Sequence, residues 1–181
     1  MIASVSNKQL AIGTWTSAAN ENTGTIVEFP ASNNRPKRTY MYVKFVKGSG
    51  SDLYQGTPVG ITTEADGAGE IVISADQSAV IGTAFIGVAV SGSTTAVTTA
   101  YYGWIQLARP YEVLESVVCI STSGANVGFY WAADGYLSTV TASRLPGAYA
   151  LSGALSDPGE SAISNRARFH LFCLGVPNQA I

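Results

Sequence analysis

Few side chains in this chain of 181 residues could do acid–base, nucleophilic or metal chemistry, since it holds one histidine, two cysteines and twelve acids. Any Ser-His-Asp or Cys-His site would have to use His170. Cys173 lies three residues further on, and on a strand that spacing turns the two side chains to opposite faces. A pairing of Cys119 with His170 stays open. We expect His170 to be a surface or interface residue, and we predict no catalytic residue.

Metal and cofactor sites find little support. Glu64, Asp66 and Glu70 lie in a Gly-rich stretch and could offer oxygens to Ca²⁺, but their spacing is not that of an EF-hand loop, so a plain turn is favoured. No Cys/His cluster suits zinc. The Gly-Ser-Gly at 48–50 and Gly-Ala-Gly at 67–69 lack the rest of a dinucleotide- or phosphate-binding loop. We therefore predict no metal and no cofactor.

Some residues could serve in hydrolysing or binding sugars. A glycosidase needs two nearby carboxylates, and the sequence cannot say which of its acids would pair. Trp15, Trp104 and Trp131 could form a platform for stacking on sugars, although such residues more often anchor a core or an interface. Cys119 and Cys173 could form one disulfide, but two small buried side chains are favoured.

The composition describes the scaffold that would carry these groups. Hydrophobic residues make up 46% and charged residues only 12%, about half the usual charged share. Such a surface, rich in hydroxyl groups, suits a protein packed against partners. The net charge of −2 argues against nucleic-acid binding. Glycine and threonine interrupt the longest apolar run, residues 79–90, which argues against a membrane span. With no secretory signal expected, synthesis in a cytoplasm is predicted.

Hydrophobic patterning indicates strands throughout. Residues 81–107 read as two core strands joined by a short polar turn, with Gly103 letting a neighbouring backbone or ring come close. Residues 111–120 fit either a helix or a buried strand, and the strand is favoured. Further strands are predicted within 11–16, 25–29, 38–47, 71–73 and 164–176, and a hairpin within 127–141. The predicted fold is all-β, a small antiparallel β-sandwich or barrel with an irregular N-terminal arm. No repeat of fixed period is visible.

The flexible stretch at 47–52 predicts a boundary between residues 1–50, an N-terminal arm with short strands, and residues 51–181, the main β domain. Just before it, alternation puts basic and aromatic side chains on one strand face. This face could be solvated, grip nucleic acid or dock a protein. We take it as a hypothetical partner-binding surface, consisting of Arg35, Lys37, Arg38, Tyr40, Tyr42 and Lys44.

Two short motifs carry a resemblance. Gly87-Val88-Ala89, a small-residue turn at 91–93, and Tyr102-Gly103-Trp104-Ile105-Gln106 follow one another. In this order they resemble the head decoration (capsid cement) proteins of tailed bacteriophages, and the likeness spans roughly residues 53–176. The segments at 57–60 and 124–128 are similar too, whereas the first 50 residues have no counterpart.

The resemblance implies a non-enzymatic structural protein of the virion, often a homotrimer, that sits on the outer capsid surface and binds the major capsid protein. It also implies synthesis in the bacterial host cytoplasm. Three alternatives stay open. They are a carbohydrate- or receptor-binding β module of a phage fibre or another surface structure, a glycosidase-like enzyme, and a shell-forming subunit.

Overall fold

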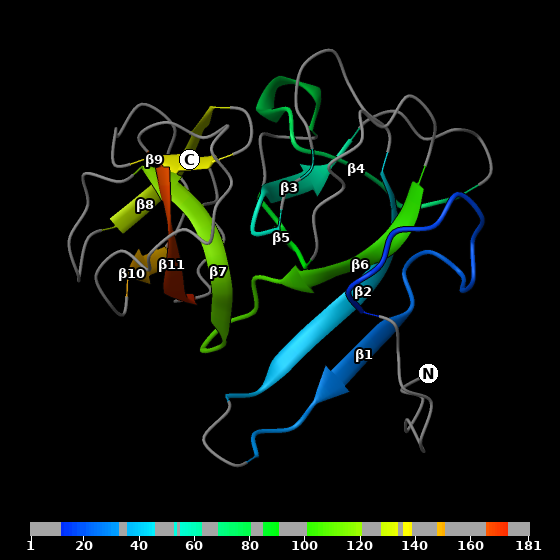
Figure 1. Ribbon diagram of the computed structural model, residues 1–181, viewed down its shortest axis with the longest axis horizontal. Helices are drawn as coiled ribbons and strands as arrows, with labels where there is room; N and C mark the ends of the chain where they lie inside the picture. The colour runs from blue at the N-terminus through cyan, green and yellow to red at the C-terminus, as the bar shows by residue number, and fades with distance from the viewer. Residues whose placement is uncertain are drawn as a thin grey trace, which may run out of the picture.

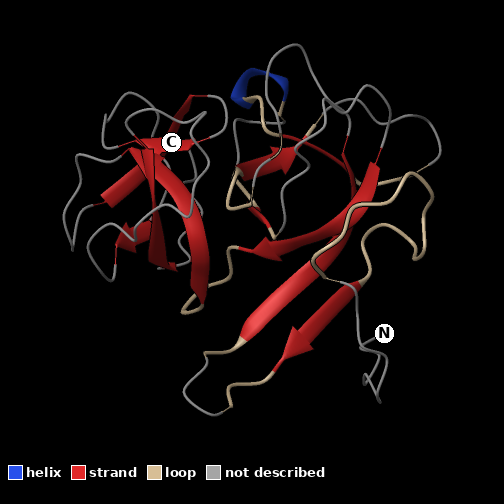
Figure 2. Ribbon diagram, in the orientation of Figure 1, coloured by secondary structure: helices blue, strands red, loops and turns tan. Residues whose placement is uncertain are grey.

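The computed structural model describes residues 12–32, 36–45, 53, 55–62, 69–80, 85–90, 101–120, 128–133, 136–138, 148–150 and 166–173. Within these residues the chain forms eleven strands and a single 3₁₀ turn, η1 (Gln77–Ala79), drawn in blue in Figure 2. The all-β class expected from the sequence is confirmed. This part of the chain contains no helix of the length and hydrophobicity needed to span a membrane.

The first group of strands is a closed ring. It contains β2 (Arg38–Phe45), β3 (Pro58–Ile61), β4 (Val72–Ser74), β5 (Gly87–Ala89) and β6 (Tyr101–Leu107). The order is β2-β4-β3-β5-β6, and the ring closes because β2 pairs with both β4 and β6. β1 (Ile26–Phe29) pairs with the first half of β2, and the two strands extend together from this first barrel (Figure 1).

The second group is a closed barrel beside the first (Figure 1). Its members are β7 (Val113–Ile120), β8 (Gly128–Ala133), β9 (Tyr136–Ser138), β10 (Ala148–Ala150) and β11 (Arg166–Cys173). The longest pairing joins β11 to β7 and carries a register shift between Phe169 and Leu171. These strands include the predicted hairpin and the predicted last strand, and β7 confirms the choice of strand over helix for residues 111–120.

The two barrels share one plan of strand pairing. In each, the first strand runs parallel to the third, and the second runs antiparallel to both the third and the fourth. In each, the fourth pairs with the fifth and the fifth pairs with the first, both antiparallel. Each barrel therefore combines antiparallel pairs with one parallel pair, whereas the sequence predicted an antiparallel fold throughout.

Unequal spacing explains why this shared plan is not accompanied by a fixed period in the sequence. The first strands begin at residues 38 and 113, an offset of 75, while the fifth strands begin at residues 101 and 166, an offset of 65. The connections thus differ in length between the two barrels.

Each barrel has its own core, and β5 contributes to both. The first core contains Met41, Val43, Phe45, Leu53, Val59, Ile73, Ala75, Ala89, Ile105 and Leu107. The second contains Leu114, Val117, Trp131, Leu137, Leu171 and Cys173, together with Val80 and Val88 from the first barrel's part of the chain. Successive residues of a strand face opposite ways, so Ala89 enters the first core while Val88 enters the second.

The predicted division near residue 50 does not separate two structural units. β2 lies before it and β3 after it, yet both belong to the first barrel. The flexible composition at 47–52 therefore marks a connection inside a barrel and not a domain boundary. The change between the two barrels falls at residues 108–112, between β6 and β7.

Within the N-terminal arm, residues 12–25 run back along the outside of the first barrel (Figure 1). The strand predicted within residues 11–16 is reduced to an isolated bridge between Thr16 and Tyr102. Gly103 lies directly beneath the Trp15 indole, where a Cβ atom would come within 2.6 Å of the ring. The close approach of a ring at Gly103 is therefore confirmed, and Trp15 holds the arm in place.

Candidate functional site

The predicted partner-binding face is covered by the protein itself. Tyr40 and Tyr42 are only 6% and 3% exposed, and they pack with Val27 and Trp104 in a cluster on the outside of the first barrel. Phe29 of β1 meets the Tyr40 ring edge-on at 5.5 Å between ring centroids. The alternation predicted for β2 is confirmed, but its second face is buried as well as its first. The two tyrosines are therefore closed to an outside partner.

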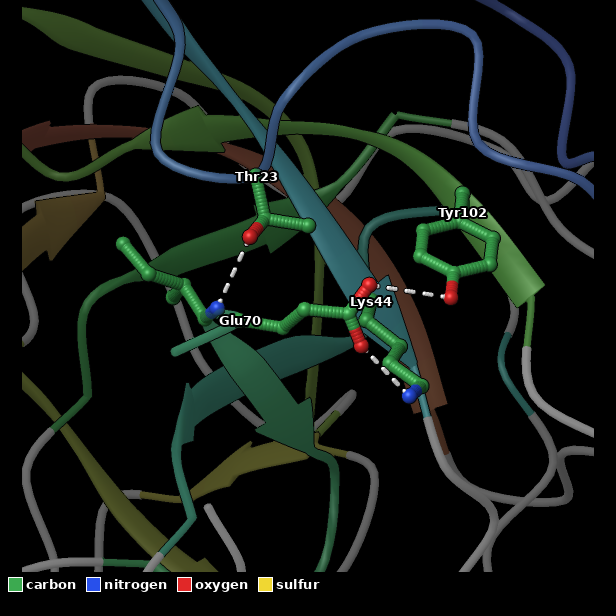
Figure 3. Close-up of polar contacts among 5 residues, drawn as sticks. Thr23, Lys44, Glu70 and Tyr102 are labelled. Atoms are coloured by element: carbon green, nitrogen blue, oxygen red, sulfur yellow. Dashed lines mark hydrogen bonds and ion pairs between the residues drawn. The ribbon is translucent and has the colours of Figure 1, made fainter. Parts of the chain in front are cut away.

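The charged members of that face that the structure describes, Lys37, Arg38 and Lys44, are engaged in ion pairs. Lys44 Nζ pairs with Glu70 Oε2 at 2.6 Å, and the Tyr102 hydroxyl donates to Glu70 Oε1 at 3.1 Å (Figure 3). On the next residue, the Ile71 N–H donates to Thr23 Oγ1 at 2.9 Å. Figure 3 shows Glu70 reaching between Lys44 and Tyr102 while Thr23 approaches from the arm. The cluster thus ties the arm, β2 and β6 to the segment that leads into β4.

The Tyr102 phenol is a poor acid in this setting. Burial raises the pKa of Tyr102, and the neighbouring Glu70 carboxylate raises it further, against a smaller lowering by Lys44. The phenol therefore stays protonated and keeps donating to Glu70. This protonation suits a structural hydrogen bond and does not suit a general base.

A second polar group lies where β2 approaches the start of β7. The Glu112 carboxylate is buried, and its Oε1 accepts a hydrogen bond from Thr39 Oγ1 at 2.9 Å and lies 3.6 Å from Lys37 Nζ. Lys37 also pairs with Glu28 at 3.2 Å, and Arg38 pairs with Glu115 at 3.5 Å. Two of the predicted contact residues, Lys37 and Arg38, therefore bind the first barrel to the second. Arg35 lies outside the described residues.

Gln106 adds two hydrogen bonds to this contact between the barrels, which we call the seam and which joins β2 and β6 to the start of β7. It is buried on β6, and its amide nitrogen donates to the Val113 carbonyl at 2.7 Å while its amide oxygen accepts from the Glu115 N–H at 3.1 Å. A side-chain amide thus pairs with the backbone of β7 as a neighbouring strand would. The roles of Gln106 and Glu112 could not be predicted from the sequence, because a partner 7 to 73 residues away decides whether a polar residue is buried.

Of the residues that could have formed a nucleophilic site, His170 and Cys173 do not converge. Cys173 is a free thiol buried in the second core, as expected of a small buried side chain, whereas His170 is half-buried and lies outside that core. Burial, followed by the nearby Glu112 carboxylate, raises the pKa of the Cys173 thiol to about 12. The thiolate is the reactive form, so Cys173 is inert at neutral pH. The side chain of Cys119 lies outside the described residues.

The candidate sugar and metal sites are accounted for in part. Trp131 and Trp104 are buried and Trp15 is partly buried against Gly103, so these rings pack inside the protein and do not form an exposed platform. Of the proposed calcium ligands, Glu70 binds Lys44 and Tyr102, and Glu64 and Asp66 lie outside the described residues. Within the part of the chain that the structure describes, no three His, Cys, Asp or Glu side chains gather as metal ligands.

Among the side chains that the structure describes, one aromatic residue is largely exposed to solvent. Tyr111 lies between β6 and β7, is 77% exposed, and has a φ of 61°. Its ring centroid lies 6.4 Å from that of Phe172 on β11. Tyr111 does not stand out in the sequence. Its position just after Arg109-Pro110 marks a turn, but nothing in the sequence indicates a left-handed backbone.

The described groups therefore form internal ties between segments, and the exposed aromatic at the junction is the feature that points outward. No protein-family model, curated protein sequence or solved structure matches the chain.

Proposed function

We propose that this protein is a non-enzymatic structural protein of a tailed-phage virion, which binds the outer surface of the capsid and stabilises the shell of major capsid protein. The observation that carries the proposal is the pairing of the two motif segments. Gly87–Ala89 and Tyr101–Leu107 are the neighbouring antiparallel strands β5 and β6, the two strands that the resemblance to capsid cement proteins implies. The turn expected at 91–93 lies outside the described residues.

The use of side chains agrees with this proposal. Several of the reactive groups that the structure describes are engaged in internal ties. Glu70 holds Lys44 and Tyr102, Glu112 holds Thr39, and the Cys173 thiol is buried. A protein that works by binding needs a stable body and an accessible contact, and it needs no pocket in which reactive groups converge.

The mechanism would be linkage. A protein that binds the assembled, expanded shell and not its separated subunits stabilises the shell by mass action. In the homotrimer that the resemblance implies, three linked copies would bind more tightly than one, since the second and third contacts are intramolecular. The N-terminal arm is not free for such contacts within residues 12–25, because it is packed on the first barrel.

The test uses the purified protein with DNA-filled heads of the phage whose genome encodes it, produced without this chain. We expect saturable co-sedimentation at a fixed number of copies per head, and a higher temperature of DNA release. Unexpanded proheads serve as the control and should bind little. A protein that fails to co-sediment with the heads contradicts the proposal, and binding to a glycan array in its place favours the carbohydrate-binding alternative.

A further inference from the structure

The turn that joins the two barrels carries a side chain that the fold itself does not use. Among the described residues, only Ile26 and Tyr111 are large hydrophobic residues with substantial exposure, at 38% and 77%. Tyr111 therefore covers little of either core. Its removal would cost the folded state little buried apolar area.

The backbone at this position also disfavours tyrosine. A φ of 61° lies in the left-handed region, which is easy for glycine and costs free energy for a bulky residue because the Cβ atom crowds the backbone. Both exposure and backbone conformation thus favour glycine or asparagine at position 111. Strained residues of this kind cluster at functional sites, where the surrounding structure holds them in place.

The surroundings do hold this residue in place. The Tyr111 N–H donates to the Cys173 carbonyl at 2.7 Å, and the Cys173 N–H donates to the Glu112 carbonyl at 3.1 Å. The Glu112 N–H closes the turn onto the Arg109 carbonyl at 3.1 Å. The Glu112 side chain is fixed in turn by Thr39. The backbone that bears the exposed ring is therefore ordered before any partner arrives, which lowers the entropy cost of binding.

We infer that Tyr111, with the edge of Phe172 beside it, is an anchor that inserts into an apolar pocket of the capsid shell. The inference rests on the proposed function and names the contact through which the protein would bind. Tyrosine is over-represented among the few residues that dominate binding energy, because it offers a large ring and a terminal hydroxyl at low entropy cost.

A protein partner fits this anchor better than a sugar does. Sugar-binding aromatic rings are accompanied by polar groups that bind the sugar hydroxyls. The acids next to Tyr111 in the chain are engaged elsewhere, since Glu112 is buried on Thr39 and Glu115 pairs with Arg38. The exposed ring lies instead beside Phe172, which gives an apolar contact.

A multivalent shell also fits better than a second copy of the chain. One tyrosine buries at most about 250 Å², whereas a stable pair of proteins buries about 800 Å² on each partner. An isolated pairing through this knob would therefore be weak. A shell presents many identical pockets, and linked copies turn weak contacts into firm attachment.

The test compares Tyr111→Gly with Ile26→Ala, a substitution at the other exposed hydrophobic residue, in co-sedimentation with the DNA-filled heads. Glycine removes the ring and relieves the backbone, so we expect Tyr111→Gly to unfold at the same or a higher urea concentration than the wild type. We expect its dissociation constant for heads to rise at least tenfold. Ile26→Ala should leave binding unchanged, and Tyr111→Phe should keep most of it.

The outcomes separate the anchor from the proposed function. If the wild-type protein does not bind heads, the proposed function fails and the anchor fails with it. If the wild type binds and Tyr111→Gly binds equally well, the anchor alone is wrong. A change in oligomeric state measured by light scattering, or a loss of glycan binding, in Tyr111→Gly without a loss of head binding also overturns it.

Discussion

The first and second barrels follow the same strand plan but differ in what completes them. The first barrel draws its core from its own part of the chain, with Trp15, Ile71, Ile86 and Tyr101 at the margin, and is covered outside by β1 and the arm. The second barrel has Trp131 at its centre and includes Val80 and Val88 of the first, with Phe85 packed alongside. The plan is shared, but the second core is complete only when the first barrel is present.

This difference shows how two barrels with the same strand plan can form a single structural unit. Two identical barrels on a linker would be independent domains with their own cores. Here β5 presents Ala89 to one core and Val88 to the other, and Gln106 hydrogen-bonds to the backbone of β7. The second barrel depends on the first, and substitutions at Gly87, Val88 and Thr39 test this dependence.

The largest loss of stability is expected at Gly87, because β5 contributes side chains to the cores of both barrels. A Cβ atom there would lie 2.2 Å from the Gln106 carbonyl oxygen, which is backbone and cannot rotate away. Gly87→Ala should therefore separate β5 from β6 and lower the free energy of unfolding by about 3 kcal/mol or more. Urea unfolding measures the loss. Gly13→Ala, where no atom lies within 4 Å of the new methyl, should change stability by less than about 0.5 kcal/mol.

Val88 tests the direction of dependence. Val88→Ala and Val59→Ala remove the same atoms from adjacent strands of the first barrel, but from different cores. Each should cost about 2 kcal/mol. In hydrogen exchange, Val88→Ala should speed exchange mainly in β7 and β11, and Val59→Ala should speed it throughout both barrels. The same pattern for both variants would show that the barrels do not differ in dependence.

Thr39 tests the seam itself. Thr39→Val keeps the shape of the side chain but removes the donor to the buried Glu112 carboxylate, so we expect a loss of about 1.5 kcal/mol. Thr25→Val is the matched control, because the Thr25 hydroxyl donates to the Asn22 carbonyl in an exposed turn. If both variants unfold at the wild-type urea concentration, the hydrogen bond does not hold the barrels together.

Alkaline pH should loosen the second barrel through its buried thiol. The pKa of Cys173 rises from 9.0 to about 12 on folding, mainly through burial. Above pH 9 the unfolded chain releases this proton while the folded chain keeps it, so stability falls as pH rises toward 12. At pH 10 the loss is about 1.4 kcal/mol.

Urea unfolding of the wild type and Cys173→Ala at pH 8 and pH 10 measures this loss. The variant begins less stable, because it leaves a cavity, but it should lose less stability between the two pH values. Equal losses in both proteins would assign the pH dependence to other groups, such as Tyr102.

Local sequence patterns made the strands predictable. The burial of the second face of β2 and the shared plan of the barrels depend on long-range pairing and could not be predicted from the sequence. Alternation fixed β2 and the aromatic run fixed β6, because a half-buried pleated surface needs those side chains whatever its neighbours are. Whether the second face of β2 is also covered depends on β1 and on residues of the arm such as Ile12, so the burial of Tyr40 and Tyr42 could not be foreseen. The shared plan of the barrels lies in which strands pair, and unequal connections hide it from the sequence.

The polar residues show the same limit at the level of single side chains. Lys44 on an alternating strand looks solvent-exposed, and only the approach of Glu70, 26 residues away, makes it an internal ion pair. Tyr111 looks like an ordinary turn residue, because its left-handed backbone follows from hydrogen bonds to β11 that no local pattern encodes.

The join at residues 108–112 has a geometric consequence. It is short and bonded at both ends, through the Ala108 N–H to the Ile86 carbonyl and through the Tyr111 N–H to the Cys173 carbonyl. The two barrels are therefore held at a fixed distance from each other. Any surface that contacts both barrels must place its contact sites at that distance. A lattice whose subunits move apart would therefore bind this protein differently, although none of its contact residues changes.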